Sequence, residues 1–169
     1  HTPTLPHSHT PTLPHSHTQT MPEAVVRVID VYCYRQPEAP AFLLFHRAEG
    51  VAYAGQWRMV GGKIDDGEAA WQTALREVRE ETGQAPSRLW TLPSVNHFYA
   101  WQQDRINLIP AFAAELDHDP TLNHEHDEFA WLAAEDAIAR LQWPEQQRLL
   151  RLTTRLLHEG VPPELEIDF

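Results

Sequence analysis

The chain has 169 residues, with 24 acidic and 13 basic side chains and a formal net charge of -11 at pH 7. This acidity disfavours a nucleic-acid polymer or an anionic membrane as partner, because their phosphates would be repelled. No apolar run approaches the roughly 18 residues of a membrane helix, and the lone cysteine, Cys33, permits no internal disulfide. We therefore expect a cytoplasmic protein with a small-molecule substrate, in which Cys33 is a buried, inert thiol.

The first segment differs from the rest of the chain. The octapeptide HTPTLPHS at residues 1–8 is repeated at residues 9–16, and residues 1–20 contain no Lys, Arg, Asp or Glu. A segment without a periodic apolar face cannot bury enough surface to become ordered, so residues 1–20 are predicted to be a disordered tail. Because Met21 follows directly, we interpret the tail as an added sequence or an upstream-start artefact, and residues 21–169 as a single domain.

The first half of this domain is predicted to be rich in strands. Ala24–Tyr34 and Ala41–Arg47 are β-branched, aromatic or aliphatic runs typical of buried strands. After a loop at Glu49–Gln56, a short strand at Trp57–Val60 is expected to lead into a turn at Gly61-Gly62. Two glycines permit unusual backbone angles and a close approach of the backbone to a ligand.

The second half alternates strands with loops and ends in helices. One or two strands are expected in Leu89–Ala100, with a break near Asn96-His97, and Pro110 predicts an edge position or a bulge in the next strand. The remaining predicted elements, in chain order, are a strand at Ile106–Leu116, a polar loop at Asp117–Asp127, a strand at Phe129–Leu132, and helices at Ala134–Leu141 and Pro144–Glu159. This order predicts an α+β fold in which helices cover both sides of a mixed sheet.

A helix carrying three glutamates is predicted over Ala69–Thr82. The stretch contains no Pro or Gly, and Gly83 follows where a left-handed C-cap is favoured. Its apolar face is expected to pack on the sheet, and is formed by Trp71, Ala74, Leu75, Val78 and Thr82. Glu77, Glu80 and Glu81 cluster on a different face, where like charges repel. A divalent cation would reverse that repulsion, and the alternative is a solvated acidic face.

The spacing around this helix resembles a known family. The pattern Gly-x5-Glu-x7-Arg-Glu-hydrophobic-x-Glu-Glu-x-Gly, from Gly62 to Gly83, resembles the Nudix box and departs from it only at Gln84, where an apolar residue is usual. The resemblance implies an α/β/α sandwich with a mixed sheet, in which the box forms a loop-helix-loop. It also implies a pyrophosphohydrolase that uses Mg²⁺, with Mn²⁺ as a substitute.

Carried over position by position, the resemblance assigns roles within the box. Glu77, Glu80 and Glu81 are expected to be metal ligands, together with Gly61, and Glu77 is able to double as the base. Arg76 is expected to pair with a box carboxylate and fix its rotamer rather than touch the substrate. Glu68 either braces the loop or caps the helix.

A second acidic cluster lies far along the chain. The Glu-His-x4-Trp-Leu pattern beginning at Glu125 and His126 resembles the Nudix branch that includes dATP and dihydroneopterin triphosphate pyrophosphohydrolases. In that branch the glutamate binds metal or activates water. We therefore expect Glu125, with Glu128 next, to contribute a ligand or the base; the alternative is a solvated loop.

Substrate contacts are expected from cations and aromatic rings near the box. Arg47, Lys63 and Arg58 are candidates for holding the far phosphates. Trp57 and Tyr99, together with Phe98 and Trp101, are candidates for stacking on a base, although core or rim packing is the alternative.

The sequence thus predicts Mg²⁺-dependent hydrolysis of a pyrophosphate linkage by metal-activated water, in a nucleoside triphosphate or a related nucleoside diphosphate derivative. Two alternatives stay open: a non-catalytic Nudix-fold nucleotide-binding or sensor module, and an acidic protein-interaction domain. A homodimer is compatible with each of these functions.

Overall fold

A computed structural model describes residues 21–169, so the prediction for residues 1–20 lies outside the described part of the chain. The elements are β1 (Glu23–Val25), β2 (Val28–Arg35), β3 (Ala41–Arg47), β4 (Trp57–Arg58), β5 (Val60–Lys63), α1 (Ala70–Thr82), β6 (Arg88–Ala100), β7 (Arg105–Glu115), β8 (His126–Ala133), α2 (Ala134–Arg140), α3 (Pro144–Glu159) and a short 3₁₀ turn, η1 (Pro163–Leu165). No helix among these residues is long and apolar enough to cross a membrane.

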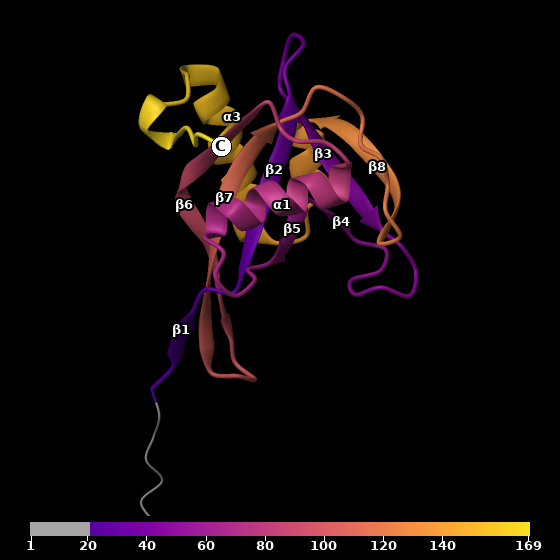
Figure 1. Ribbon diagram of the computed structural model, residues 1–169. Helices are drawn as coiled ribbons and strands as arrows, with labels where there is room; N and C mark the ends of the chain where they lie inside the picture. The colour runs from indigo at the N-terminus through magenta and orange to yellow at the C-terminus, as the bar shows by residue number, and fades with distance from the viewer. Residues whose placement is uncertain (1–20) are drawn as a thin grey trace, which may run out of the picture.

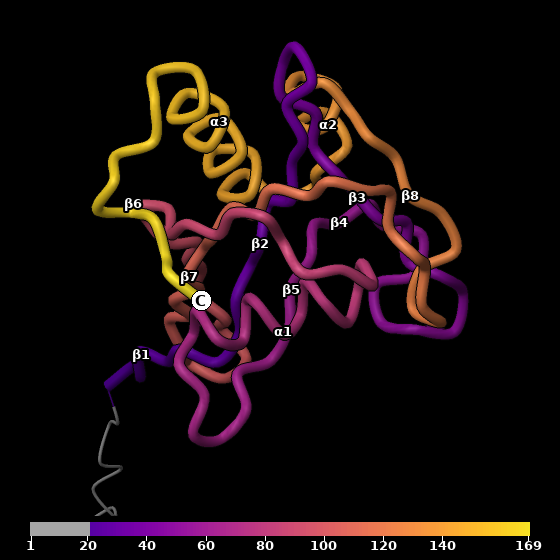
Figure 2. The backbone as a smooth tube through the Cα atoms, turned by 45° about the horizontal axis from the view of Figure 1, so that its top comes forward, coloured from indigo at the N-terminus to yellow at the C-terminus, as the bar shows by residue number. Residues whose placement is uncertain are grey.

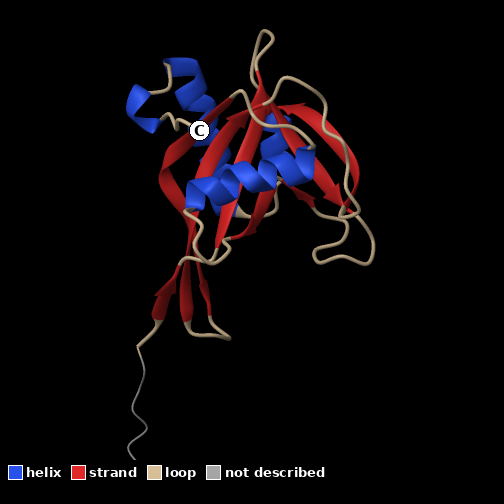
Figure 3. Cartoon of the chain, viewed as in Figure 1, coloured by secondary structure: helices blue, strands red, loops and turns tan. Residues whose placement is uncertain are grey.

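The strands form one mixed sheet with helices on both faces (Figures 1 and 3). The path runs β1-β7-β2-β3-β4, while β5 pairs with β2, β6 with β7 and β8 with β3. The pairings β1–β7 and β2–β7 are parallel and the other pairings are antiparallel. The α1 helix covers one face, and α2 and α3 lie together on the other. This arrangement confirms the predicted α+β sandwich.

Alternation along β2 separates the two layers of the core. Ile29, Val31 and Cys33 belong to the cluster that packs under α1, whereas Tyr32 and Tyr34 belong to the cluster under α2 and α3. Successive side chains of a strand point to opposite faces, so one β2 strand supplies both layers. Cys33 is 1% exposed, which confirms the predicted buried thiol, and burial raises its pKa far above the usual range.

The sheet divides towards one end, and this division positions the functional residues. β2 pairs with β3 only at Tyr34–Phe42 and Arg35–Ala41. Beyond that point β2 pairs with β5, whereas β3 pairs with β4 and β8. The start of β8, the end of β3 and the glycines of β5 therefore surround an opening that the second half of α1 adjoins.

Two predictions about the first strands were wrong in detail. The run Ala24–Tyr34 is two strands, interrupted at residues 26–27. Gly61 and Gly62 lie within β5, paired with Asp30 and Ile29, rather than in a turn; the turn follows at Asp66-Gly67. The glycines are extended because β2 offers a backbone partner that the local sequence does not reveal.

The strands β6 and β7 also differ from expectation. β6 continues through Asn96-His97, and its irregularity lies earlier, between Thr91 and Val95, where Pro93 interrupts the pairing. Pro110 is not in an edge strand, since β7 pairs with β6 on one side and with β1 and β2 on the other. Instead, Pro110 lies where the pairing on both sides of β7 is irregular. On one side the partner of β7 changes from β1 to β2, and on the other side β6 has a register shift.

The terminal segments complete the second layer. Pro144 begins α3, and the helix buries Leu149, Leu150 and Leu156 while Leu152 and Leu157 are partly buried, as its periodicity predicts. After α3 the chain returns along β6 (Figure 2), where Ile167 N–H donates to the Leu89 carbonyl at 2.9 Å. Residues 166 and 167 thus extend the edge of the sheet.

Candidate active site

The α1 helix forms as predicted and carries its three glutamates into different environments. Gly83 has φ 76° and caps the helix, with its N–H bonded to the Arg79 carbonyl. Glu81 is 4% exposed, Glu77 is half-buried and Glu80 is exposed. Glu81 therefore shares the buried face with Val78 and Thr82, which the prediction of a separate acidic face did not anticipate.

Glu81 is the central buried acid of the site. Its Oε2 accepts a hydrogen bond from the Gly61 N–H at 3.1 Å. Burial, reinforced by the negative charges of Glu77 and Glu125, raises the pKa of Glu81 from 4.5 to about 8. A carboxylate in this position lacks a full counter-charge, so its ionised form would be stabilised by an added cation.

Glu77 reaches the backbone of β5 through the space left by a glycine. A Cβ atom at Gly62 would overlap the carboxylate and Cγ of Glu77. Burial is also the main cause that raises the pKa of Glu77, opposed by Arg76. Gly62 is therefore required by the close approach of this side chain.

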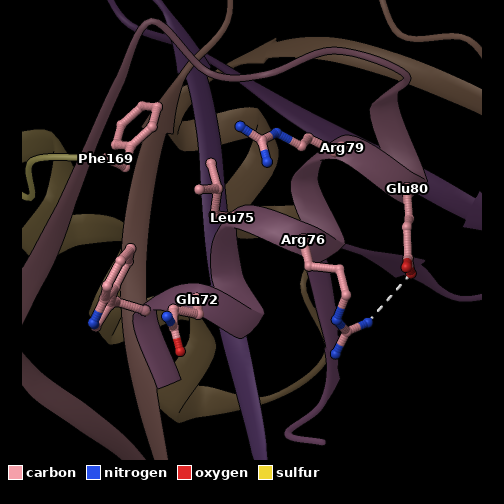
Figure 4. A pocket seen from close by; sticks show the side chains of 7 residues that line it. Gln72, Leu75, Arg76, Arg79, Glu80 and Phe169 are labelled. Atoms are coloured by element: carbon pink, nitrogen blue, oxygen red, sulfur yellow. Dashed lines mark hydrogen bonds and ion pairs between the residues drawn. The ribbon is translucent and has the colours of Figure 1, made fainter. Parts of the chain in front are cut away.

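Arg76 forms hydrogen bonds to three of the glutamates in the Nudix-box pattern. Its Nε and Nη2 donate to the two oxygens of Glu68 at 2.9 Å each, its Nη1 donates to Glu77 at 2.9 Å, and its Nη2 also donates to the Lys63 carbonyl. Its Nη1 donates in addition to Glu80 at 3.3 Å (Figure 4). Glu68 in turn accepts from the Asp65 N–H and the Thr73 hydroxyl. Of the two roles left open for Glu68, bracing the loop matches these contacts, since the N-cap is Ala69 without a side-chain bond.

The start of β8 brings a second group of ligating atoms to Glu81. Glu81, Glu125 and His126 each offer one atom, and these atoms lie within 4.8 Å of one another. Arg47 Nη1 donates to Glu125 Oε2 at 3.2 Å, so this acid is paired with a cation in the structure. Glu128, the second choice from the sequence, is exposed and lies outside the group.

His126 is buried at the junction of these residues. Its Nε2 lies 3.7 Å from Glu81 Oε1, and its ring stacks on Phe45 with centroids 4.6 Å apart. Burial and the charge of Arg47 lower the pKa of His126 to about 4, so the ring is neutral at pH 7. The sequence pattern placed His126 next to Glu125 but did not predict its contact with Glu81.

A cleft of about 860 Å³ opens from this group, on the sheet face opposite α1. Of the predicted substrate contacts, Arg47, Arg58, Lys63 and Tyr99 line it, as does Phe98. Such a volume suits a nucleotide-sized ligand. Gly61 and Glu81 form the end of the cleft that adjoins the acidic group.

Two predicted aromatic contacts lie elsewhere. Trp57 is covered by the Arg140 guanidinium, 4.5 Å from its ring centroid, and is tilted against His46. Trp101 is 73% exposed and does not line the cleft. Trp57 therefore has a packing role and Trp101 lies at the rim, which were the alternatives to stacking on a base.

The cleft floor contains a polar pair that the sequence analysis did not select. Asn96 Nδ2 donates to Asp30 Oδ2 at 3.0 Å, and both side chains are 6% exposed. Burial raises the pKa of Asp30, opposed by the hydrogen bond from Asn96. An acid inside the apolar run VIDVYCY is the signal that could have found it.

A second, smaller depression of about 400 Å³ lies on the outer side of α1 (Figure 4). Trp71, Leu75, Arg79 and Phe169 line it together with the outward-facing part of Arg76 and Glu80. It includes neither Glu77 nor Glu81, so the larger cleft is the candidate substrate site.

Comparison with known proteins agrees with this geometry. The profile of the NUDIX domain matches residues 25–153. The chain belongs to the Nudix family. It is 32% identical to the mouse bis(5'-nucleosyl)-tetraphosphatase [asymmetrical] over 114 residues, which cover 65% of this chain and 76% of the mouse protein.

Solved Nudix structures share the fold. A NUDIX hydrolase from Listeria monocytogenes superposes with a TM-score of 0.67 and 26% identity, over 78% of this chain and 94% of that one. The Escherichia coli dihydroneopterin triphosphate pyrophosphohydrolase has a TM-score of 0.64 and 21% identity, over 80% of this chain and 99% of that one. The family and its relatives identify the chain as a Nudix pyrophosphohydrolase, which removes the alternative of an acidic interaction domain. Assignment to the dihydroneopterin triphosphate branch stays a prediction.

Nudix hydrolases use a divalent metal, and the residues present suit one. The site offers carboxylate oxygens and a neutral imidazole. It also contains the buried acid Glu81, whose negative charge is not balanced by a neighbouring positive charge. Oxygen ligands are preferred by Mg²⁺, and imidazole is also accepted by Mn²⁺. The repulsion among Glu77, Glu81 and Glu125 would be relieved by a bound cation, so the charges of the site fit a divalent metal.

Proposed function

We propose that this Nudix hydrolase cleaves a P–O–P linkage in a nucleoside triphosphate, or in a related nucleoside diphosphate derivative, in the presence of Mg²⁺. For a triphosphate the products are a nucleoside monophosphate and pyrophosphate. The observation that carries the proposal is the meeting of Glu81, Glu125 and His126 at the end of a nucleotide-sized cleft. Mn²⁺ is the expected substitute.

Glu77, Glu80, Glu81 and Glu125, with the Gly61 backbone, are the proposed ligands. When bound, the cation supplies positive charge that screens phosphate oxygens and makes a water molecule more acidic. Arg76 holds Glu77 and Glu80 through hydrogen bonds of 2.9 and 3.3 Å, which restrict their rotamers before the cation arrives. Arg76 is therefore a positioning residue.

Glu125 is the proposed base, with Glu77 as the alternative. Its carboxylate is paired with Arg47 at 3.2 Å. A substrate phosphate placed in the cleft would compete for the same guanidinium, because Arg binds phosphate and carboxylate with the same donor geometry. Transfer of Arg47 to the phosphate would free the Glu125 carboxylate to accept a proton from the attacking water. Lys63 and Arg58 offer further positive charge along the cleft wall.

Product formation, measured by anion-exchange chromatography for each candidate substrate with and without Mg²⁺, tests the reaction. The panel contains nucleoside triphosphates, a dinucleoside polyphosphate, ADP-ribose and dihydroneopterin triphosphate. We expect Mg²⁺-dependent turnover of at least one of them. Its complete absence, with nucleotide binding retained, would favour the sensor alternative instead.

Glu80→Gln tests the ligand set. Turnover should drop by about 100-fold or more, while the melting temperature is retained because Glu80 is exposed. Glu125→Gln should lower turnover by as much as Glu80→Gln or less. Glu135→Gln, an exposed acid in α2 on the other face of the sheet, is the matched control and should keep wild-type rates. Wild-type turnover in Glu80→Gln would remove the proposed mechanism.

The proposed setting is the cytoplasm, with a small nucleotide or pyrophosphate as the partner and with no nucleic-acid polymer or membrane. Homodimer formation is compatible with this activity and is tested by light scattering of the purified chain.

A further inference from the structure

The Asp30–Asn96 pair in the cleft floor is incompletely satisfied. Within residues 21–169, the bond from Asn96 Nδ2 to Asp30 Oδ2 is the only side-chain hydrogen bond that either residue makes, and Asp30 has no ion pair. The one buried side-chain polar atom without any contact to solvent or partner in this part of the chain is His126 Nδ1. Asp30 Oδ1 and Asn96 Oδ1, which this bond does not use, therefore remain accessible from the cleft that both residues line.

A purely structural role accounts poorly for this pair. Burying a carboxyl group is unfavourable unless hydrogen bonds or a counter-charge replace water. Asp30 has one neutral donor, and Arg58, the nearby cation, lies over the Tyr53 ring, 4.2 Å from its centroid. A ligand that donates hydrogen bonds to the free oxygens would remove this deficit.

The pair lies where a ligand held at the acidic group would place its organic part. Asp30 pairs with Gly61 across β2 and β5, and Gly61 donates to Glu81. The cleft continues from there past Asn96 to Phe98, whose side chain is 51% exposed. An exposed aromatic ring beside buried hydrogen-bonding groups suits a heteroaromatic ring, since the faces stack and the edges hydrogen-bond.

We propose that Asp30 and Asn96 select the substrate by accepting hydrogen bonds from a ring N–H and an adjacent exocyclic amino group, the 2-amino-4-oxopyrimidine edge that guanine and pterin share. This proposal rests on the function proposed above. The two free oxygens belong to side chains that are joined by a 3.0 Å hydrogen bond and that both line the cleft, so this part of the cleft offers two acceptors. Two acceptors match two neighbouring donors.

Other bases fit this edge less well. Adenine and cytosine present one donor beside one acceptor on the corresponding edge, so one oxygen of the pair would face another acceptor. Sites built to hydrogen-bond a substrate reject analogues that leave buried polar groups unpaired. The pair therefore predicts discrimination against ATP and CTP, and a smaller discrimination against ITP, which keeps the ring N–H but lacks the amino group.

Wild-type kcat/KM values for GTP, ITP, ATP and dihydroneopterin triphosphate test the proposal, with Mg²⁺ present. We expect GTP or dihydroneopterin triphosphate to exceed ATP by about tenfold or more, as a bidentate contact allows, with ITP intermediate. The comparison of GTP with dihydroneopterin triphosphate tells guanine from pterin. The proposal would be overturned if neither GTP nor dihydroneopterin triphosphate exceeded ATP in kcat/KM.

Asp30→Asn changes the acceptor with almost no change in shape. It should reduce the GTP-to-ATP or pterin-to-ATP preference by about tenfold, chiefly through a lower kcat/KM for the GTP or pterin substrate. Thr153→Val, which changes another buried, hydrogen-bonded polar side chain far from the cleft, is the matched control and should keep the preference. If Asp30→Asn fails to fold, Asn96→Ala gives the same readout. A folded variant with the wild-type preference would refute the assignment.

Binding separates this proposal from the proposed reaction. Calorimetry with the α,β-methylene analogues of GTP and ATP needs no turnover. If the wild type hydrolyses no substrate but binds the GTP analogue more tightly than the ATP analogue, and Asp30→Asn removes that difference, the reaction is wrong and base selection stands. Turnover without any base preference would instead support the reaction and refute base selection.

Discussion

At the scale of single residues, Gly62 shows how a missing side chain can build a site. A Cβ at this position would meet the end of the Glu77 side chain, which can move, rather than rigid backbone. Gly62→Ala should therefore displace the Glu77 carboxylate, lowering kcat/KM by about tenfold or more, with little loss of stability. Steady-state kinetics and a thermal melt of the same sample check this. Retained activity would mean that the position of Glu77 is unimportant.

Glu81 predicts a pH-dependent stability. Its pKa is raised to about 8, so between pH 4.5 and 8 the folded state holds a proton that the unfolded state releases. Stability therefore falls as pH rises through this window. His126, whose pKa is lowered from 6.5 to about 4, has the opposite effect, but only below pH 6.5.

The Glu81 effect is isolated above pH 6.5. Between pH 6.5 and 8 the metal-free wild type should lose on the order of 1–2 kcal/mol of unfolding free energy relative to Glu81→Gln. Denaturant titrations at several pH values measure it. Mg²⁺ should reduce the loss in the wild type, because it binds the ionised acid. Parallel pH profiles for the two proteins would show that Glu81 ionises normally.

At the scale of elements, Gln84 explains the one departure from the box pattern. Its amide donates to the His118 carbonyl at 2.8 Å and accepts from the His118 N–H at 3.2 Å. The side chain thus holds the end of α1 to the loop that leads to Glu125. An apolar residue at this position could not make either bond.

Gln84→Ala should loosen that loop. We expect a stability loss of about 1 kcal/mol and faster hydrogen exchange at the His118 amide. Gln103→Ala, in the turn between β6 and β7, is the control and should change neither. Unchanged exchange at His118 would mean that other contacts order the loop.

Elements with a strong local pattern were predictable from the sequence. α1 and α3 have clear periodicity and terminal Gly or Pro signals, and both begin and end within one residue of expectation. β5 was missed because Gly61 and Gly62 are extended only through pairing with β2. The same holds for the candidate site. The glutamates of α1 could be predicted because their spacing lies along one helix. The approach of His126 to Glu81, and of Asn96 to Asp30, depends on how distant strands are arranged.

At the scale of the whole molecule, the contacts that hold the fold together lie within residues 21–169. Both core layers and the cleft are formed by this part of the chain. Deletion of residues 1–20 should therefore leave both the melting temperature and the turnover unchanged. A drop in either would assign a role to the repeated octapeptide.

The burial of Cys33 gives the molecule an intrinsic reporter. The thiol lies on the central strand β2, within the layer under α1, and is the sole cysteine of the chain. A maleimide or aromatic disulfide can react with it only when the sheet separates from the helix that carries the box. The rate of alkylation would therefore report how often α1 separates from the sheet. Slower labelling in the presence of Mg²⁺ would show that the ion stabilises the packing of α1 on the sheet.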